Sequence, residues 1–405
     1  MKTYFYFQPE YVREFQCDGS KCDARCCKGW AITIDAATYK KYSRIKPKDK
    51  AKAITSRMKF DSERGEYVVT LNEKFFCPFL SKGLCSLQLE YGEDFLSQTC
   101  ATYPRRTHAI GNFFERSLTL TCPVAAELIL FNPEPMRFEF LEVPDKIHSK
   151  HGRIEITKLP VKENAADLIR EVQITMITIL QERRLTLDQR LILLGLFLDK
   201  LNENQKYGQD KETILQLIAG YRLEEFLMGD ALDFAQSFDF DAKRFISFIM
   251  RFISYDLDIL RRSEDLRFLI AFEEVLGIKP DKNNKIFLSE ITANFERLAD
   301  ARADFLAKYS SFLENYLVNE LFFSLYPWKF KESFTKNYAM FLISYKIFEL
   351  MTFATVHSGL DSKEDLLQMV DWFMMKTDHN PDLYKRFLEL LKGVDDTYLL
   401  MVTLL

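Results

Sequence analysis

Residues 17–30 read C-D-G-S-K-C-D-A-R-C-C-K-G-W, and they open a region that holds every cysteine of the chain. Residues 123–405 contain none. The eight cysteines are Cys17, Cys22, Cys26, Cys27, Cys77, Cys85, Cys100 and Cys122. Cysteines that served as small buried hydrophobes would be spread along the chain. Their segregation predicts that the first third needs thiolates and that the rest is arranged around it.

Length and composition limit the class of protein. A chain of 405 residues exceeds what one core usually holds, so two or three domains are expected. Its 47% apolar and 28% charged residues are typical of a soluble globular protein. A net charge of −4 and a pI near 5.9 argue against a nucleic-acid partner.

The sequence shows no export or membrane signal. Pro9, Glu10 and Arg13 interrupt any apolar run at the start of the chain, so no signal peptide is expected. The most apolar window, residues 338–345, ends at Lys346 and is too short to cross a bilayer. We therefore expect a cytoplasmic protein with no membrane partner. Disulfides are rare in that compartment, which favours metal ligation by the cysteines.

The pattern of the first third predicts a small irregular α+β cysteine-rich metal-binding domain over residues 1–145. We expect strands at 3–7, 31–35, 66–71 and 113–121, and a short helix at 36–42. Their separations are too irregular for βαβ units. Residues 146–160, with lysine, histidine, serine and glycine, are expected to be a linker.

The sequence after Pro160 predicts a large all-α domain over residues 161–405. Apolar residues recur there with a period of 3.6, and no fixed repeat is visible. Core packing explains the many aromatic residues, with a ligand groove as the alternative. The expected helices cover residues 165–183, 187–201, 242–260, 266–276, 291–306, 338–353, 363–375 and 382–391.

The cysteine spacing leaves several kinds of metal chemistry open. Structural zinc usually shows two C-x2-C pairs, whereas this chain reads C-x4-C-x3-C-C followed by long gaps. Prolines follow Cys77 and Cys122, as one follows the last cysteine of bacterial ferredoxin motifs. One iron–sulfur cluster, zinc in one or two sites, and buried thiols or redox pairs are all consistent with this pattern. The adjacent Cys26 and Cys27 must point differently, so one of them could serve a second site or be buried.

Taken together, the motifs C-x4-C-x3-C-C-K-G-W, C-P-F-L…C and C-A-T-Y-P-R…L-T-C-P resemble the flagellin lysine-N-methylase family. That family belongs to a wider group of cysteine-rich, zinc- or iron-chelating proteins. The resemblance covers about residues 5–130, and the helical remainder only in general character. It implies methyl transfer from S-adenosylmethionine to surface lysines of flagellin by a protein that carries a [4Fe-4S] cluster, with zinc as the alternative metal.

Two common methyl-donor sites are missing from the sequence. No G-x-G-x-x-G lies between a strand and a helix, and no C-x3-C-x2-C loop occurs. The donor would then be bound in another way. A cluster with three thiolates could offer an open iron to the donor's amino and carboxylate groups, and one with four could favour its sulfonium by negative charge. The sequence does not choose between them.

The methylase interpretation also calls for a base and for groups that bind the donor. A lysine ammonium, with a pKa of about 10.4, must lose a proton before it attacks. Tyr103, His108 and Asp35 are the candidates for the base, and each could equally be structural.

We expect the donor to bind beside the cluster, at the motif Lys28, Gly29 and Trp30 and at Arg105. Lys28 and Arg105 could bind its carboxylate, or they could compensate the thiolates. Trp30 could stack on its adenine or pack the domain.

The helical domain is expected to dock the protein substrate. Residues 1–145 carry 21 lysines and arginines against 19 acids, which is a charge of +2. The whole chain carries −4, so residues 146–405 carry −6. Negative charge would attract a lysine-bearing surface. The alternative function is a non-catalytic zinc- or iron-binding adaptor whose helices bind a partner, and an electron-transfer module is a third.

Overall fold

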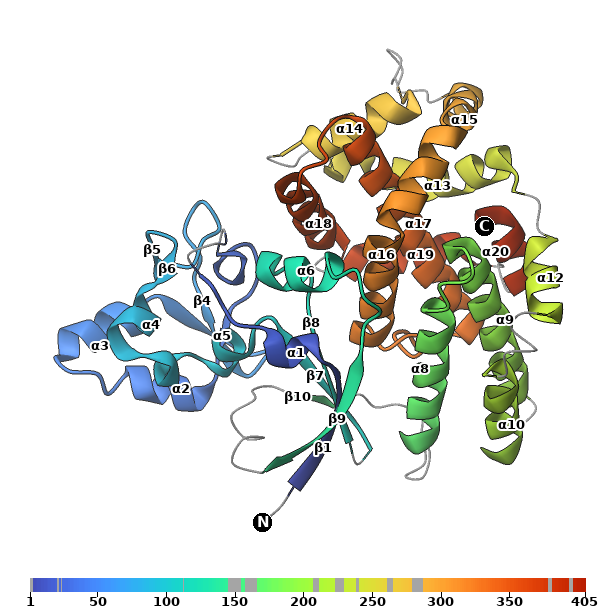
Figure 1. The fold of residues 1–405 in the computed structure, drawn as a ribbon. Coiled ribbons are helices and arrows are strands. Elements are labelled where there is room, and N and C mark those ends of the chain that lie inside the picture. Colours follow the sequence, from blue (N-terminus) through green and yellow to red (C-terminus); the bar gives the residue numbers. More distant parts are fainter. Residues whose placement is uncertain are drawn as a thin grey trace. The chain divides into compact units, whose positions relative to one another are not determined.

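The computed structural model divides the chain into two compact units. The first contains residues 1–128 and 137–160, and the second contains residues 129–136 and 161–405. The described residues are 3–19, 22, 24–111, 113–144, 154–156, 166–206, 211–222, 229–237, 240–260, 265–278, 287–377, 381–392 and 396–405. Figure 1 labels the elements along the chain.

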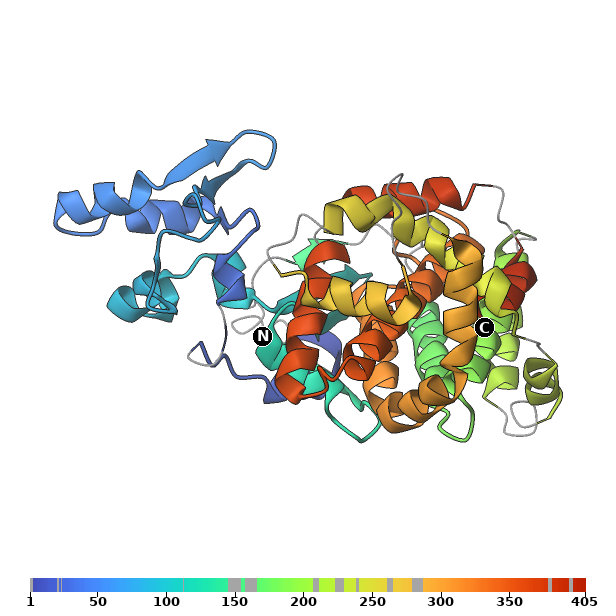
Figure 2. The ribbon, with the colours of Figure 1, turned by 90° about the horizontal axis from the view of Figure 1, so that it is seen from above.

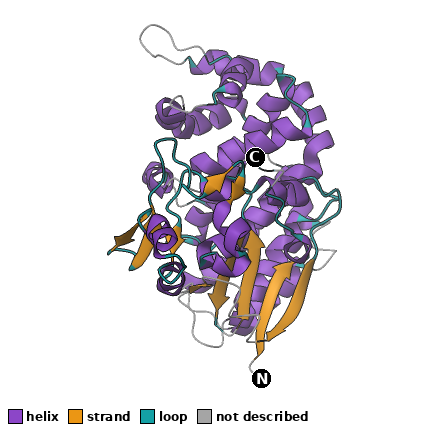
Figure 3. Cartoon of the chain, turned by 90° about the vertical axis from the view of Figure 1, so that its left-hand side faces the viewer, coloured by secondary structure: helices purple, strands orange, loops and turns teal. Residues whose placement is uncertain are grey.

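A five-stranded mixed sheet forms one part of the first unit, and its strands lie side by side in Figure 3. Its order is β10-β7-β8-β1-β9. Strand β1 runs parallel to β8 and antiparallel to β9, and β7 pairs with β8 in an antiparallel hairpin. Gly111 has a φ of +58° in the turn of this hairpin. The strands are β1 (Thr3–Pro9), β7 (Arg105–Ile110), β8 (Phe113–Leu118), β9 (Phe138–Pro144) and β10 (Ile154–Ile156).

This sheet corrects two expectations. The first domain was expected to be irregular, but the segments on either side of the cysteine-rich run form a continuous sheet. The expected linker at 146–160 lies mostly outside the described residues, and its described part, Ile154–Ile156, pairs with β7. The chain also enters the second unit earlier than expected, at residues 129–136.

The other part of the first unit carries most of the cysteines. A three-stranded sheet, β2-β4-β3, and the hairpin β5-β6 lie among short helices. The helix expected at 36–42 is confirmed as α2. The strands are β2 (Thr33–Ile34), β3 (Met58–Asp61), β4 (Glu66–Val69), β5 (Leu80–Ser81) and β6 (Leu84–Cys85). The helices of this part are α2 (Ala36–Tyr42), α3 (Lys48–Thr55), α4 (Ser86–Tyr91) and α5 (Gln98–Thr102). Helix α1 (Tyr11–Glu14) contacts β8 of the five-stranded sheet, and the last two residues of α6 (Pro123–Leu130) belong to the second unit.

The second unit is helical in its described residues, as Figure 2 shows. Helix α17 packs against α9, α14, α16 and α18. The first helices are α8 (Ala166–Leu180), α9 (Leu187–Lys206), α10 (Lys211–Tyr221), α12 (Asp230–Gln236), α13 (Ala242–Leu260) and α14 (Arg267–Leu276). The others are α15 (Leu288–Arg297), α16 (Ala299–Phe323), α17 (Phe334–His357), α18 (Lys363–Thr377), α19 (Pro381–Leu390) and α20 (Thr397–Leu404).

Helix α17 is longer and more apolar than the sequence analysis allowed. It contains an 18-residue window that could cross a membrane by length and composition, but 83% of that window is buried in the structure. One of its two lysines, Lys346, is buried against Asp188 and Glu349 at 2.7 and 2.9 Å. These features are those of a core helix packed on all sides.

Candidate functional site

Five cysteines meet in the core of the smaller part of the first unit. Cys27 and Cys77 are buried there, and Cys26, Cys85 and Cys100 pack against them partly exposed. The same core contains Ile32, Tyr42 and Phe79. We call these five the core thiols. All eight cysteines of the chain are free of disulfides.

Backbone hydrogen bonds bring the core thiols together. Cys77 donates its N–H to the carbonyl of Cys27 at 2.7 Å, and Leu80 donates to the carbonyl of Cys77 at 3.0 Å. Leu80 then pairs with Cys85 across the hairpin β5-β6. Cys100 is placed by the start of α5, where its N–H donates to the hydroxyl of Ser97 at 3.2 Å. Four separate segments therefore deliver thiols to one core.

The core thiols differ widely in acidity. The sulfurs of Cys26 and Cys27 lie 3.9 Å apart. The hydrogen bond between them lowers the pKa of Cys26 to about 7 and raises that of Cys27. A hydrogen bond with Cys27 likewise lowers the pKa of Cys77. Burial raises the pKa of Cys100 to about 12, and the charges of Cys77 and Cys85 add to the effect. Ionising all five would need a cation to compensate them.

Cys17, Cys22 and Cys122 lie outside that core, and we call them the outer thiols. Burial raises the pKa of Cys122 to about 12, and the charges of Cys22 and Cys17 contribute. Arg105 faces this group: its own pKa is lowered by burial, and the charges of Cys17 and Cys122 oppose that decrease. Its guanidinium also lies 5.0 Å from the centre of the Phe15 ring. Arg105 therefore lies near the thiols of Cys17 and Cys122, where its charge would favour their ionised forms.

The spacing of the thiols bears on which metal they suit. A tetrahedral zinc with Zn–S bonds of 2.3 Å needs its sulfurs about 3.8 Å apart. Within the described part of the chain, no three histidine, cysteine, aspartate or glutamate side chains lie close enough to hold a single ion. A four-iron cluster is larger, and it takes cysteine thiolates. The number and chemistry of the core thiols fit such a cluster, while the 3.9 Å between the sulfurs of Cys26 and Cys27 is also close to the zinc spacing, so the geometry does not separate the two metals.

The motif Lys28-Gly29-Trp30 continues directly from the core thiols. Lys28 pairs with Phe76 across an isolated bridge, and its ammonium lies 4.9 Å from the centre of that ring. Gly29 has a φ of +80°, which favours glycine, and donates its N–H to the carbonyl of Phe75 at 3.0 Å. The indole N–H of Trp30 donates to the carbonyl of Cys26 at 3.2 Å.

The three candidate bases have different surroundings. The ring of Tyr103 stacks on Trp30 with centroids 6.1 Å apart, and its hydroxyl lies 3.1 Å from that of Thr121. His108 is buried in β7, paired with Glu115 of β8. Tyr103 is thus linked to the core thiols through Trp30, whose indole N–H is bonded to the carbonyl of Cys26.

Asp35 caps two helices, which argues against the base role. Its carboxylate accepts from the N–H and the hydroxyl of Thr38 at 2.9 and 2.8 Å, and from the N–H of Gln98 at 3.1 Å. Burial alone would raise its pKa, but these hydrogen bonds outweigh burial and lower it. A carboxylate of lowered pKa is a weaker base.

Three polar residues near the core thiols were missed from the sequence. Ser97 is fully buried and its hydrogen bond lowers the pKa of Cys100. The charge of Arg57 lowers the pKa of Cys77. Tyr42 donates its hydroxyl to the carbonyl of Phe95 at 2.6 Å. Ser97 carries a recognisable signal, since serine before a short helix is a frequent N-cap, but nothing in the sequence marks the other two.

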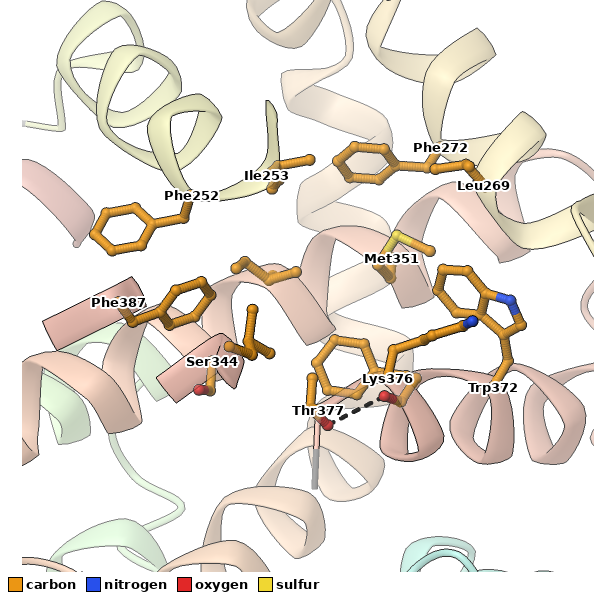
Figure 4. A pocket seen from close by; sticks show the side chains of 13 residues that line it. Phe252, Ile253, Leu269, Phe272, Ser344, Met351, Trp372, Lys376, Thr377 and Phe387 are labelled. Carbon is orange, nitrogen blue, oxygen red and sulfur yellow. Dashed lines mark hydrogen bonds between the residues drawn. The ribbon is translucent and has the colours of Figure 1, made fainter. Parts of the chain in front are cut away.

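The helical unit contains an apolar cavity, which Figure 4 shows from close by. Aromatic and aliphatic side chains line most of it, among them Phe272, Met351 and Trp372. Lys376 reaches its edge, and burial lowers the pKa of this lysine. The cavity contains no cysteine or carboxylate, so it offers little chemistry compared with the core thiols.

Comparison with known proteins decides the family. The family model of the FliB lysine N-methylase C-terminal domain matches residues 173–402. The chain belongs to this family. The resemblance seen in the cysteine motifs is thereby confirmed through the helical part of the chain.

Two curated relatives each match about a third of the chain. A lysine-N-methylase of Salmonella choleraesuis is 36% identical over 143 residues, which are 34% of this chain and 35% of that protein. The flagellar biosynthetic protein FliU of Salmonella muenchen is 36% identical over 143 residues, which are 34% of this chain and 83% of FliU. The matched part thus spans about a third of the length of the lysine-N-methylase. No solved structure matches the chain.

Proposed function

We propose that this protein is a cytoplasmic lysine N-methyltransferase that moves a methyl group from S-adenosylmethionine to surface lysines of flagellin. Membership of the FliB lysine N-methylase family supports the reaction, and a relative named as a flagellar biosynthetic protein supports the substrate. The convergence of five thiols in one small core supports a dependence on a [4Fe-4S] cluster.

The core thiols are the residues that would hold this cluster. Cys77, Cys85 and Cys100 come from separate segments, and either Cys26 or Cys27 could complete the set. A cluster bound there would supply an open iron for the donor's amino and carboxylate groups, or negative charge favourable to its sulfonium. Arg57 would offset part of the thiolate charge, since it already favours the ionised form of Cys77.

The chain's own residues would have to prepare the lysine. The neutral ε-amine attacks the methyl carbon, the carbon–sulfur bond breaks, and S-adenosylhomocysteine leaves with the electron pair. The base takes one proton from the lysine ammonium before this attack. The methylated nitrogen therefore carries two protons, one fewer than the original ammonium. Tyr103 is the candidate we favour, because its ring stacks on Trp30 and Trp30 is bonded to Cys26.

The donor would be bound by the residues that follow the core thiols. Trp30 is only partly buried, which leaves part of its indole for the adenine. Lys28 lies beside it and could bind the donor's carboxylate, with exposed Gly29 allowing close approach. Arg105 is the weaker candidate, because it is largely buried, which lowers its pKa, and faces the thiols of Cys17 and Cys122. The acidic helical unit would dock flagellin.

Binding of S-adenosylmethionine to protein purified without oxygen tests this proposal against the adaptor alternative. We expect saturable binding by isothermal titration, and weaker binding by the variant Trp30→Ala than by the control Trp328→Ala in the helical unit. Absence of binding by a brown, iron-loaded protein would favour the adaptor.

A further inference from the structure

A lysine of the helical unit is enclosed by aromatic rings. The ammonium nitrogen of Lys329 lies 4.3 Å from the ring centre of Tyr384, 5.0 Å from that of Tyr326 and 5.6 Å from that of Phe330. We call these three rings the aromatic cage. Phe330 also contacts both other rings, with centroids 5.2 Å from Tyr384 and 6.4 Å from Tyr326. Cages of this kind bind ammonium groups through the negative faces of the rings.

A buried carboxylate forms the floor of the aromatic cage. The ammonium of Lys329 donates to Glu320 Oε1 at 3.2 Å and to the hydroxyl of Tyr384 at 2.9 Å. Glu320 is only 4% exposed. Its second oxygen, Oε2, is buried and has no hydrogen-bond partner among the residues that the structure describes. A buried carboxylate oxygen without a partner is costly, so this site has capacity for a further donor.

The aromatic cage is built in advance of any ligand. Glu320 belongs to α16 and Tyr384 to α19, while Tyr326, Lys329 and Phe330 lie in the connection between α16 and α17 (Figure 1). Asn337, which is fully buried, holds this connection: it accepts from the N–H of Phe330 at 3.0 Å and donates to its carbonyl at 3.2 Å. The connection that carries Tyr326 and Phe330 is therefore held in place, whereas the occupant is the end of a flexible side chain.

We propose that the aromatic cage is a binding site for a lysine side chain of a protein partner, and that Lys329 fills it in the free protein. An incoming lysine would exchange with Lys329, which is 17% exposed and can turn toward solvent. The two acceptors, Glu320 and Tyr384, favour an ammonium that keeps its N–H groups, because each methyl group removes one donor. Recognition of a substrate lysine here rests on the proposed function, but the binding itself does not.

Rescue with a small ammonium ion tests the site. Lys329→Ala empties the cage and leaves Ser324, whose hydroxyl donates to Glu320 Oε1 at 2.6 Å, as the remaining side-chain donor to that carboxylate, so n-butylammonium should raise the melting temperature of the variant in a saturable way. Trimethylbutylammonium, which has no N–H, should raise it less. The control is Lys336→Ala, which removes a lysine paired with Glu332 on the surface. Equal effects of butylammonium on both variants would overturn the proposal.

A second measurement uses the unchanged chain, in case Lys329→Ala does not fold. Acylation of lysines by a water-soluble ester, read by peptide mass spectrometry, reports how often each ammonium is free. Because butylammonium also consumes the ester, labelling is read as the ratio of Lys329 to Lys336, and butylammonium should increase this ratio at least threefold. An unchanged ratio at saturating butylammonium would contradict the exchange. Neither measurement involves the methyl donor, so a failure of methyl transfer would be seen separately.

Discussion

Cys77 donates its backbone N–H to the carbonyl of Cys27 at 2.7 Å, and this bond ties together two cysteine segments that are distant in the sequence. The thiols of the same two residues also share a hydrogen bond that lowers the pKa of Cys77. Backbone and side chains thus fix the same junction. The junction between the two segments is therefore formed without a bound metal.

The thiols of metal-free, reduced protein should react with iodoacetamide at very different rates. Cys26 has a pKa of about 7, so about 90% of it is thiolate at pH 8, whereas Cys100, with a pKa of about 12, is almost wholly protonated. We expect alkylation of Cys26 to be at least roughly 100-fold faster, rising with pH through about 7 and then levelling off. Peptide mass spectrometry measures both rates. In the unfolded chain the two rates should be similar, and similar rates in the folded protein would count against these pKa values.

Asp35 should contribute to stability through its helix cap. Asp35→Ala should lower the free energy of unfolding of this region by about 1 kcal/mol, and Asp35→Asn should cost less because asparagine also caps. The pKa of Asp35 is lowered on folding, so its contribution is complete above its ordinary value of 3.8 and is lost as the pH falls through the folded value. Hydrogen exchange of the α2 amides measures this. A stable Asp35→Asn protein that could not transfer methyl groups would instead restore the base role.

The bounds of a helix were predicted best from the sequence where the helix keeps one polar face. The expected helix at 242–260 agrees with α13, where apolar residues form a clear stripe. The expected helix at 291–306 instead covers parts of α15 and α16, which are separated at Leu298. From Phe312 onward α16 is buried on all sides, so its sequence shows no stripe and its extent could not be predicted.

The segregation of the cysteines predicted that they ligate a metal, which stays a prediction, but their grouping could not be predicted. Which thiols share a core depends on the pairing of Cys27 with Cys77 and on the hairpin that carries Cys85, and neither follows from spacing. Strand β7 was missed because it begins with two arginines and does not alternate. The capping role of Asp35 could not be predicted in full, because one of its hydrogen bonds comes from Gln98, a residue brought near by the fold.

Two helical glycines should respond oppositely to alanine. A Cβ on Gly195 in α9 would lie 2.8 Å from Met401 and from Tyr338, so Gly195→Ala should destabilise the helical unit by about 1–3 kcal/mol. Gly220 in α10 has nothing within 4 Å, so Gly220→Ala should be neutral or gain roughly 0.5 kcal/mol. Thermal unfolding followed by circular dichroism compares them. A Gly195→Ala protein as stable as the unchanged chain would show that α9 packs differently.

Removal of the Tyr103 hydroxyl should slow methyl transfer without disturbing the site. Tyr103→Phe keeps the ring on Trp30 and removes the group that bonds with Thr121. We expect kcat to fall about 100-fold, as for loss of a general base, with donor binding and colour unchanged. Tyr39→Phe is the control, since that ring stacks on Tyr67. If Tyr103→Phe kept the full rate and the same pH profile, the base would have to be another residue.

The central claim is that the core thiols carry a cluster on which methyl transfer depends. It is tested most directly by measuring iron, sulfide and transfer of a labelled methyl group from S-adenosylmethionine to purified flagellin, all on the same anaerobic preparations. We predict that the unchanged chain and Cys17→Ser contain the cluster and methylate flagellin lysines, and that Cys100→Ser loses both. Transfer at the full rate by a Cys100→Ser protein that lacks iron would contradict the account.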